Sequence, residues 1–150
     1  MSLKKFFMNL YFKYFPIKFV ILGVPGIIQN SRGEILLGKR SGTAPFYPLN
    51  WGLPGGLVDY GETLEQAIRR EIKEEIEVDS KVIKHGKPFN DRPSKKSRLH
   101  AINIPMYCKI IGKPKVADET CEVRWFSPKE IRKMRLAYKH KEILKQEGLI

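Results

Sequence analysis

Residues Gly56–Val78 read GLVDYGETLEQAIRREIKEEIEV, a tight turn followed by a helical pattern. Thr63 is a favourable residue for the start of a helix, and Gln66 three positions later completes a capping box. Apolar residues recur every four positions, at Leu64, Ile68, Ile72 and Ile76. Because this spacing places them on one face, it predicts an amphipathic helix that begins after Thr63 and packs against a core.

The predicted helix is unusually acidic for this chain. The protein has 28 Lys and Arg against 16 Asp and Glu, a formal net charge of +12, yet eight of the acids lie between Asp59 and Asp79. Like charges one helical turn apart destabilise a helix by roughly 0.2–0.5 kcal/mol per pair. Two interpretations fit this pattern. The acids form either a solvated face paired with arginines or a set of carboxylates that holds a hard divalent cation.

The spacing of these residues resembles the Nudix box, G-x5-E-x7-R-E-U-x-E-E-x-G-U, in which U is aliphatic. The matching positions are Gly56, Glu62, Arg70, Glu71, Ile72, Glu74, Glu75 and Val78. The last glycine of the pattern is Glu77 in this chain. Glycine ends a helix in the left-handed conformation at little cost. We therefore expect Glu77 either to end the helix differently or to carry a cost of about 1 kcal/mol.

The resemblance implies an α/β fold, the Nudix-type α/β/α sandwich with a mixed β-sheet, in which the box helix carries the metal site. It implies that Mg²⁺ or Mn²⁺ is held by Glu71, Glu74 and Glu75, helped by the backbone carbonyl of Gly55. Cations of this kind prefer oxygen ligands. The resemblance also implies hydrolysis of a diphosphate linkage, with Arg70 and the three glutamates as catalytic residues and Arg70 orienting the glutamates.

Two further acidic residues have expected roles near this site. Glu62 is expected to support the metal ligands from outside rather than to bind the ion. Glu119 lies in an acidic segment that precedes Trp125-Phe126, and this arrangement resembles the segment after the box in many Nudix proteins. Glu119 is therefore expected either to complete the metal shell or to act as the base for the attacking water.

The candidates for substrate binding precede the box. Arg40 closes a strand, and its guanidinium can bind two phosphate oxygens; the alternative is a surface charge at a strand end. Phe46, Tyr47 and Trp51 lie in the loop of residues 41–54. Aromatic side chains on a loop can stack on a base or close the core beneath it. We expect Trp51 to form core or the wall of a pocket, and Phe46 or Tyr47 to contact the base.

Apolar runs before the box predict a first hairpin. A strand over 20–29 is interrupted at Pro25, a turn follows at 30–33, and a returning strand covers 34–40. The elements expected after the box are a strand from residue 81, a basic loop over 84–98, a long strand over 99–111, a short strand over 123–126, and helices over 128–135 and 136–146.

Length and composition restrict the class of protein. A chain of 150 residues can bury one core, so we expect residues 1–150 to form a single Nudix domain with residues 1–19 as an aromatic, basic extension. Cys108 and Cys121 fit neither a disulfide scaffold nor a CxxC metal motif, which predicts reduced thiols in a cytoplasmic protein. The extension lacks the apolar run of a signal peptide or membrane span. It is expected to pack on its own domain or on a second copy in a homodimer; the alternative is contact with an anionic membrane surface.

The charge and the box together favour a small anionic nucleotide as substrate. Residues 136–146, LAYKHKEILKQ, resemble the tail of ADP-ribose pyrophosphatases, so a substrate of the type NDP–X is favoured, with NMP and P–X as products. One alternative is a nucleoside triphosphate pyrophosphohydrolase of the housecleaning type, and another is a nucleotide-binding regulatory module without turnover. Hydrolysis of RNA is disfavoured because the chain contains no RNA-recognition motif; nucleic acid is therefore not an expected partner.

Overall fold

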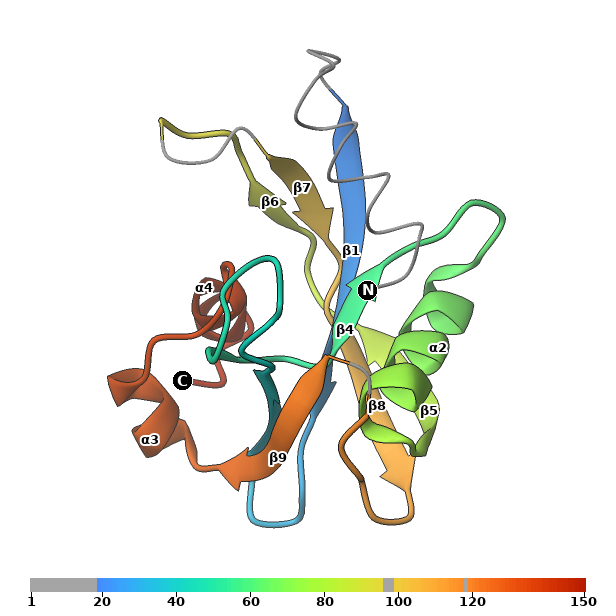
Figure 1. The fold of residues 1–150 in the computed structure, drawn as a ribbon, viewed down its shortest axis with the longest axis vertical. Helices are drawn as coiled ribbons and strands as arrows, with labels where there is room; N and C mark the ends of the chain where they lie inside the picture. Colours follow the sequence, from blue (N-terminus) through green and yellow to red (C-terminus); the bar gives the residue numbers. More distant parts are fainter. Residues whose placement is uncertain (1–18, 96–98, 118) are drawn as a thin grey trace.

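The computed structural model describes residues 19–95, 99–117 and 119–150. The expectations for the N-terminal extension therefore fall almost entirely outside the described residues. Within the described ranges the strands form a six-stranded and a three-stranded sheet, and the helices lie on either side of them (Figure 1). None of these helices is long and apolar enough to span a bilayer.

The larger sheet is built on β1 (Val20–Ile28). β1 runs parallel first to β7 (His100–Asn103) and then to β8 (Met106–Ile111). Residue n of β1 lies opposite residue n + 80 in both pairings, so β7 and β8 follow β1 in one register. The long strand expected over 99–111 thus exists, but it is interrupted at residues 104–105, where Pro105 has no N–H to donate.

Three shorter strands complete this sheet. They are β4 (Gly55–Leu57), antiparallel to β1, β5 (Asp79–His85), antiparallel to β8, and β6 (Phe89–Asp91), antiparallel to β7. Residues 84–95 are therefore not simply a basic loop, because they contain the end of one strand and all of another. Pairing with β7 accounts for this difference, since it supplies backbone partners that the local sequence does not reveal.

The predicted first hairpin is wrong beyond its turn. The turn forms, because Gly33 N–H donates to Asn30 O at 3.0 Å, and one antiparallel bridge joins Gln29 to Ile35. The chain then enters the smaller sheet, whose order is β3 (Trp51–Gly52), β2 (Ile35–Arg40) and β9 (Thr120–Phe126). β1 and β2 thus belong to different sheets. β1 also continues through Pro25, which lies opposite Gly55 of β4.

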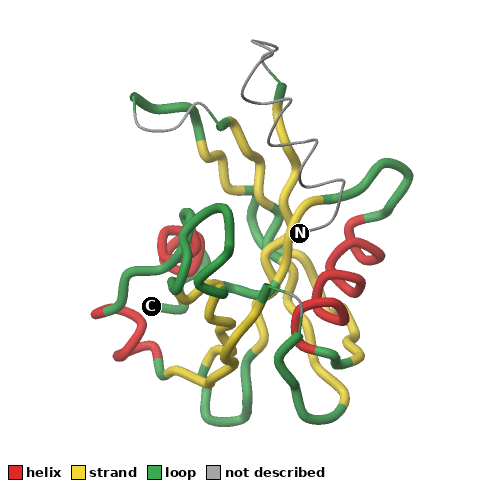
Figure 2. The backbone as a smooth tube through the Cα atoms, in the orientation of Figure 1, coloured by secondary structure: helices red, strands yellow, loops and turns green. Residues whose placement is uncertain are grey.

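The helices lie on the two sides of the strands, as expected for an α/β/α sandwich (Figure 2), and cover two separate cores. α2 (Leu64–Ile76) buries Ala67, Ile68, Ile72 and Ile76 against one side of the sheets, where Val24, Ile28, Leu36 and Met106 also lie. The other core contains Ile27, Ile35, Leu37, Leu53, Phe126, Ile131, Leu136 and Leu144. β1 and β2 thus contribute side chains to both cores, which confirms the predicted fold class.

α2 begins as the capping box predicts. Thr63 Oγ1 accepts the N–H of Gln66 at 3.2 Å, and Gln66 Oε1 accepts the N–H of Thr63 at 2.9 Å. At its other end, Glu77 has φ 49° and ψ 33°, the left-handed conformation, and its N–H donates to Lys73 O. The helix therefore ends in the left-handed conformation that glycine usually provides. Because Glu77 has a Cβ atom, this conformation carries a steric cost.

The C-terminal helices are shorter than expected. α3 (Pro128–Lys133) begins at the capping box of Ser127 and Glu130 but ends before Arg135. α4 (His140–Gln146) begins four residues later than predicted. Tyr138, with φ 52°, interrupts the expected helix over 136–146. A left-handed residue cannot belong to a right-handed helix, and the contacts that hold Tyr138 come from distant parts of the chain.

Candidate active site

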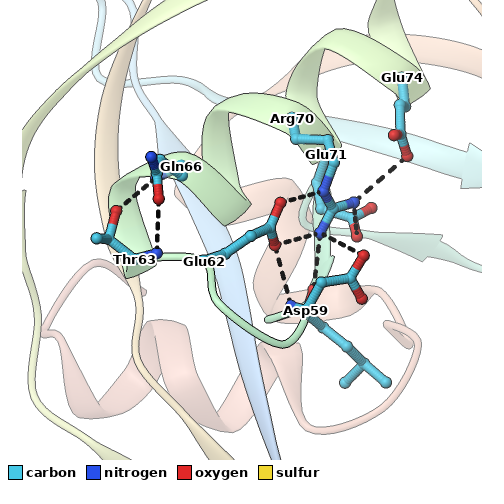
Figure 3. A network of polar contacts seen from close by, with 8 residues as sticks. Asp59, Glu62, Thr63, Gln66, Arg70, Glu71 and Glu74 are labelled. Carbon is cyan, nitrogen blue, oxygen red and sulfur yellow. Dashed lines mark hydrogen bonds and ion pairs between the residues drawn. The ribbon is translucent and has the colours of Figure 1, made fainter.

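Arg70 is the centre of a polar network on α2 (Figure 3). Its Nε and Nη2 donate to the two oxygens of Glu62 at 2.7 and 2.9 Å, a bidentate arrangement. Nη1 donates to Glu71 at 2.7 Å and to Glu74 at 3.4 Å, and Nη2 also donates to Leu57 O at 3.0 Å. The hydrogen bonds to Glu62, followed by those to Glu71, raise the pKa of Arg70 above its ordinary value. This guanidinium is permanently charged and holds three box glutamates.

Glu62 joins Arg70 to the turn before the helix. One Glu62 oxygen accepts the N–H of Asp59 at 2.9 Å, while Glu62 N–H donates to Asp59 O at 3.0 Å. The Asp59 carboxylate is 3.9 Å from Arg70 Nη2. The structure therefore places Glu62 between the turn and Arg70.

Glu71 and Glu75 lie against the backbone of β4. A Cβ atom added to Gly56 would lie 2.5–2.7 Å from the carboxylate atoms of Glu71, so only glycine leaves room for that group. Gly55 N–H donates to Glu75 Oε2 at 3.0 Å. β4, which contains the first residue of the box, and the box helix therefore meet through two of the three candidate ligands.

The box residues have the donor chemistry of a site for a hard cation, since carboxylate and carbonyl oxygens suit Mg²⁺. Among the described residues, however, no group of three or more His, Cys, Asp or Glu side chains converges as a metal ion would require. The reason is local: Glu71 and Glu74 are directed to Arg70, and Glu75 is directed to Gly55 N–H. Mg²⁺ is often bound through only one or two carboxylates together with substrate phosphates, so this arrangement is compatible with such a site.

Arg40 and Glu119 meet beside the end of α2. Arg40 Nη2 lies 3.4 Å from Glu119 Oε2, and both side chains are less than one-fifth exposed. Arg40 Nε also donates to Phe46 O at 2.7 Å. The segment before Glu119 is tied to the box helix, because Ala117 N–H donates to Glu75 O at 3.1 Å. The candidate phosphate contact and the candidate late acid therefore share one location.

The three loop aromatics separate into two environments. Phe46 and Tyr47 are 54% and 39% exposed, and the Tyr47 ring centroid lies 4.7 Å from that of Tyr138. The Trp51 ring instead packs edge-on against Phe126 at 4.8 Å and adjoins the second core. Trp51 also lines a cleft of about 450 Å³ whose other lining residues are Phe126, Glu130, Lys133, Met134 and Arg135. This cleft includes none of the box carboxylates.

The NUDIX domain family matches residues 21–146, which covers the box, Arg40 and Glu119. The chain belongs to the Nudix family. It is 38% identical over 125 residues to an ADP-ribose pyrophosphatase of Methanocaldococcus jannaschii, a match that covers 83% of this chain and 70% of the relative. It is also 28% identical over 134 residues to the nucleoside triphosphatase NudI of Escherichia coli, covering 83% of this chain and 94% of the relative.

Solved Nudix structures have the same fold. A MutT protein from Methanosarcina mazei superimposes with a TM-score of 0.76 at 25% identity, over 87% of this chain and 94% of that protein. The family and its relatives make this protein a Nudix hydrolase, an enzyme of a family that acts on small nucleotide substrates.

Sequence reasoning missed two residues of this Nudix hydrolase that lie beside the candidate site, Tyr138 and His140. His140 Nδ1 accepts the N–H of Leu53 at 2.9 Å, just before Gly55, and Ala137 N–H donates to Trp51 O at 2.7 Å. Although His140 as a whole is partly exposed, burial lowers its pKa to about 4. The only available signal was the similarity of this tail to ADP-ribose pyrophosphatases, which gave no role to either side chain.

Proposed function

We propose that this Nudix hydrolase cleaves a nucleoside diphosphate linked to another moiety, NDP–X, into NMP and P–X, with ADP-ribose as the favoured type of substrate. The observation that carries the proposal is the 38% identity to an ADP-ribose pyrophosphatase across 83% of this chain. The site supports it, because Arg70 and the three candidate glutamate ligands lie together on α2, and Arg40 contacts Glu119, whose preceding segment is hydrogen-bonded to the end of that helix.

We further propose that catalysis depends on a divalent cation, Mg²⁺ or Mn²⁺. The residues that would hold it are Glu71, Glu74, Glu75 and the Gly55 carbonyl, and Glu119 either completes this set or takes the proton of the attacking water. A bound cation supplies a water of lowered pKa and neutralises charge on the phosphate oxygens. Arg70 would hold two of these ligands in position, because it donates hydrogen bonds to Glu71 at 2.7 Å and to Glu74 at 3.4 Å.

Arg40 is proposed to bind the diphosphate. Its Nη2 has a long contact of 3.4 Å with Glu119, whereas Nε donates to Phe46 O at 2.7 Å. A guanidinium binds phosphate oxygens in a fork. Arg40 is therefore held in position through Nε, while its terminal nitrogens are available to exchange a weak partner for a phosphate.

The test is release of the nucleoside monophosphate from ADP-ribose and from a panel of nucleoside diphosphate sugars and triphosphates, with Mg²⁺ or Mn²⁺. Wild-type enzyme is expected to prefer ADP-ribose, and Glu74→Gln to lose most of that turnover. Glu65→Gln, an exposed acid on the first turn of the same helix, is the matched control and should keep it. Full activity of Glu74→Gln, or activity that is unchanged by a chelator, would contradict the proposed metal chemistry.

The second candidate function is pyrophosphohydrolysis of nucleoside triphosphates. The specific observation in its favour is the 28% identity to NudI, which extends over 94% of that relative. The same panel separates the two candidates. A preference for a triphosphate would retain the proposed chemistry and replace the substrate, whereas absence of turnover on every nucleotide would contradict both.

A further inference from the structure

Tyr138 lies where several separate parts of the chain meet. Its ring centroid is 4.7 Å from that of Tyr47, in the loop after β2, and 5.5 Å from the ring of His140. The Arg40 guanidinium, at the end of β2, lies over the Tyr138 ring at 5.5 Å. The side chain therefore contacts both the exposed aromatic loop and the residue proposed to bind phosphate.

Two carboxylates of the candidate site, Glu119 and Glu75, affect the ionisation of the Tyr138 phenol. Burial is the largest cause that raises the pKa of Tyr138; Arg40 opposes it, and the negative charges of Glu119 and Glu75 add to it. Glu119 contacts Arg40 directly, and Glu75 contacts Gly55. The Tyr138 ring thus lies beside the loop aromatic Tyr47 and under Arg40, which in turn contacts Glu119, so a nucleotide with its base at the loop and its phosphates at Arg40 would pass over Tyr138.

The backbone around Arg40 is strained in a way that favours a binding role. Four non-glycine residues in the described part of the chain have positive φ, and three of them surround this site: Tyr47, Leu49 and Tyr138, with φ of 50°, 61° and 52°. Such conformations persist only where the surrounding structure imposes them, and they cluster at ligand sites. Leu49 N–H also donates to Arg40 O, so the strained loop is fastened to the same residue.

We propose that Tyr138 is a specificity-determining residue: its ring and that of Tyr47 form the wall on which the base of the substrate nucleotide packs, while Arg40 binds the adjoining diphosphate. The inference rests on the proposed nucleotide hydrolysis and adds the element that recognises the base. Aromatic rings stack on bases favourably. Trp51 is not part of this wall, because its ring packs against Phe126.

The test compares Tyr138→Phe, Tyr138→Leu and Tyr138→Gly with wild type. Phenylalanine keeps the ring, and glycine adopts a positive φ without strain. The Leu and Gly variants are expected to raise KM for ADP-ribose about tenfold, with kcat changed less than about twofold and Tyr138→Phe near wild type. Tyr60→Leu, which alters a fully exposed tyrosine, is the matched control.

A base-specific readout separates this role from a purely structural one. AMP and ribose 5-phosphate are used as metal-free ligands, and their binding is measured by calorimetry. Tyr138→Gly should weaken AMP binding about tenfold and leave the binding of ribose 5-phosphate unchanged. Equal weakening of both ligands, or a lower melting temperature with unchanged AMP binding, would overturn the inference.

The outcome is distinguishable from failure of the proposed function. If wild-type enzyme prefers a triphosphate to ADP-ribose, the proposed substrate is wrong, and the same variants are then tested on that nucleotide and its monophosphate. If wild type hydrolyses ADP-ribose and the Leu and Gly variants keep its KM, the substrate stands and the role of Tyr138 is refuted.

Discussion

Arg70 shows how much of this site depends on the shape of one side chain. Its guanidinium makes hydrogen bonds to three carboxylates and one backbone carbonyl, of which the pair to Glu62 is bidentate. A lysine carries the same charge but presents it at one point, so it cannot satisfy these groups together. The geometry of the donors, in addition to their charge, keeps the box glutamates in place.

We therefore predict that Arg70→Lys lowers the free energy of unfolding by about 1–3 kcal/mol and reduces turnover at least about a hundredfold. Urea denaturation and AMP release measure the two effects. The matched control is Arg69→Lys, on the exposed neighbouring position of the same helix. Similar behaviour of the two variants would show that Arg70 has no special role.

Gly56 supports a second prediction at this scale. Because a Cβ at position 56 would overlap the Glu71 carboxylate, Gly56→Ala should displace that carboxylate and lower kcat strongly. The backbone at Gly56 does not have positive φ, so the loss of stability comes from this overlap alone and should be about 1–3 kcal/mol. Gly42→Ala is the control, since its Cβ would meet only Leu49 at 3.7 Å. Unchanged kcat in Gly56→Ala would show that the position of Glu71 is not important.

The residues of the site were predictable only where spacing along the chain identifies them. Gly55, Arg70 and the box glutamates lie within 21 positions and were all proposed from sequence. Tyr138 and His140 lie more than 60 residues later and reach the site through contacts with Arg40, Tyr47 and Leu53 N–H. The hydrophobic periodicity of the sequence cannot predict such contacts, because they depend on how the two sheets are arranged.

Among the elements, α2 was predictable because its limits are set by local chemistry. The capping box at Thr63 and the apolar stripe are both encoded within one stretch of sequence. The first hairpin was wrong because β1 finds partners 80 residues away and β2 pairs with β3 and β9. α4 begins late because Tyr138 is held in a left-handed conformation by tertiary contacts.

The end of α2 gives a prediction at the scale of the element. Glu77 is left-handed, and glycine adopts that conformation without the Cβ penalty, so Glu77→Gly should raise the free energy of unfolding by about 0.5–1 kcal/mol. Urea denaturation measures the change. Glu65→Gly, in the first turn of the same helix, should instead lower it by about 1 kcal/mol. Destabilisation by Glu77→Gly would indicate that its side chain stabilises the exit.

At the scale of the whole molecule, the chain between the two sheets is held from several sides. Residues 51–55 connect β3 to β4, and their backbone bonds with Ala137, His140, Gly26 and Glu75. The partners come from the C-terminal segment, from β1 and from α2. Protonation of His140 Nδ1 would therefore remove its hydrogen bond with Leu53 N–H, in the connection between the sheets and close to Gly55.

We predict a pH dependence of stability that arises from His140. Its pKa is about 4 in the folded protein and 6.5 ordinarily, so between these values the unfolded chain binds the additional proton. The free energy of unfolding should therefore fall as the pH falls from 6.5 to 4, by up to about 3 kcal/mol. His140→Asn should remove this contribution, whereas His85→Asn, at an exposed site, should retain it. Equal pH profiles for wild type and His140→Asn would contradict the prediction.

The parallel pairing of β1 with strands 80 residues later has a consequence for biosynthesis. At about 5–20 residues per second, the ribosome needs roughly 4–16 s to make the intervening chain. Throughout that interval Ile27 and Ile28, which the finished protein buries, lack β8, the strand that later lies beside them. We expect nascent chains that end before β7 to be cleaved readily by protease at β1 and to bind chaperones. Protection should appear only after β8 has been synthesised, which a series of arrested chains would show.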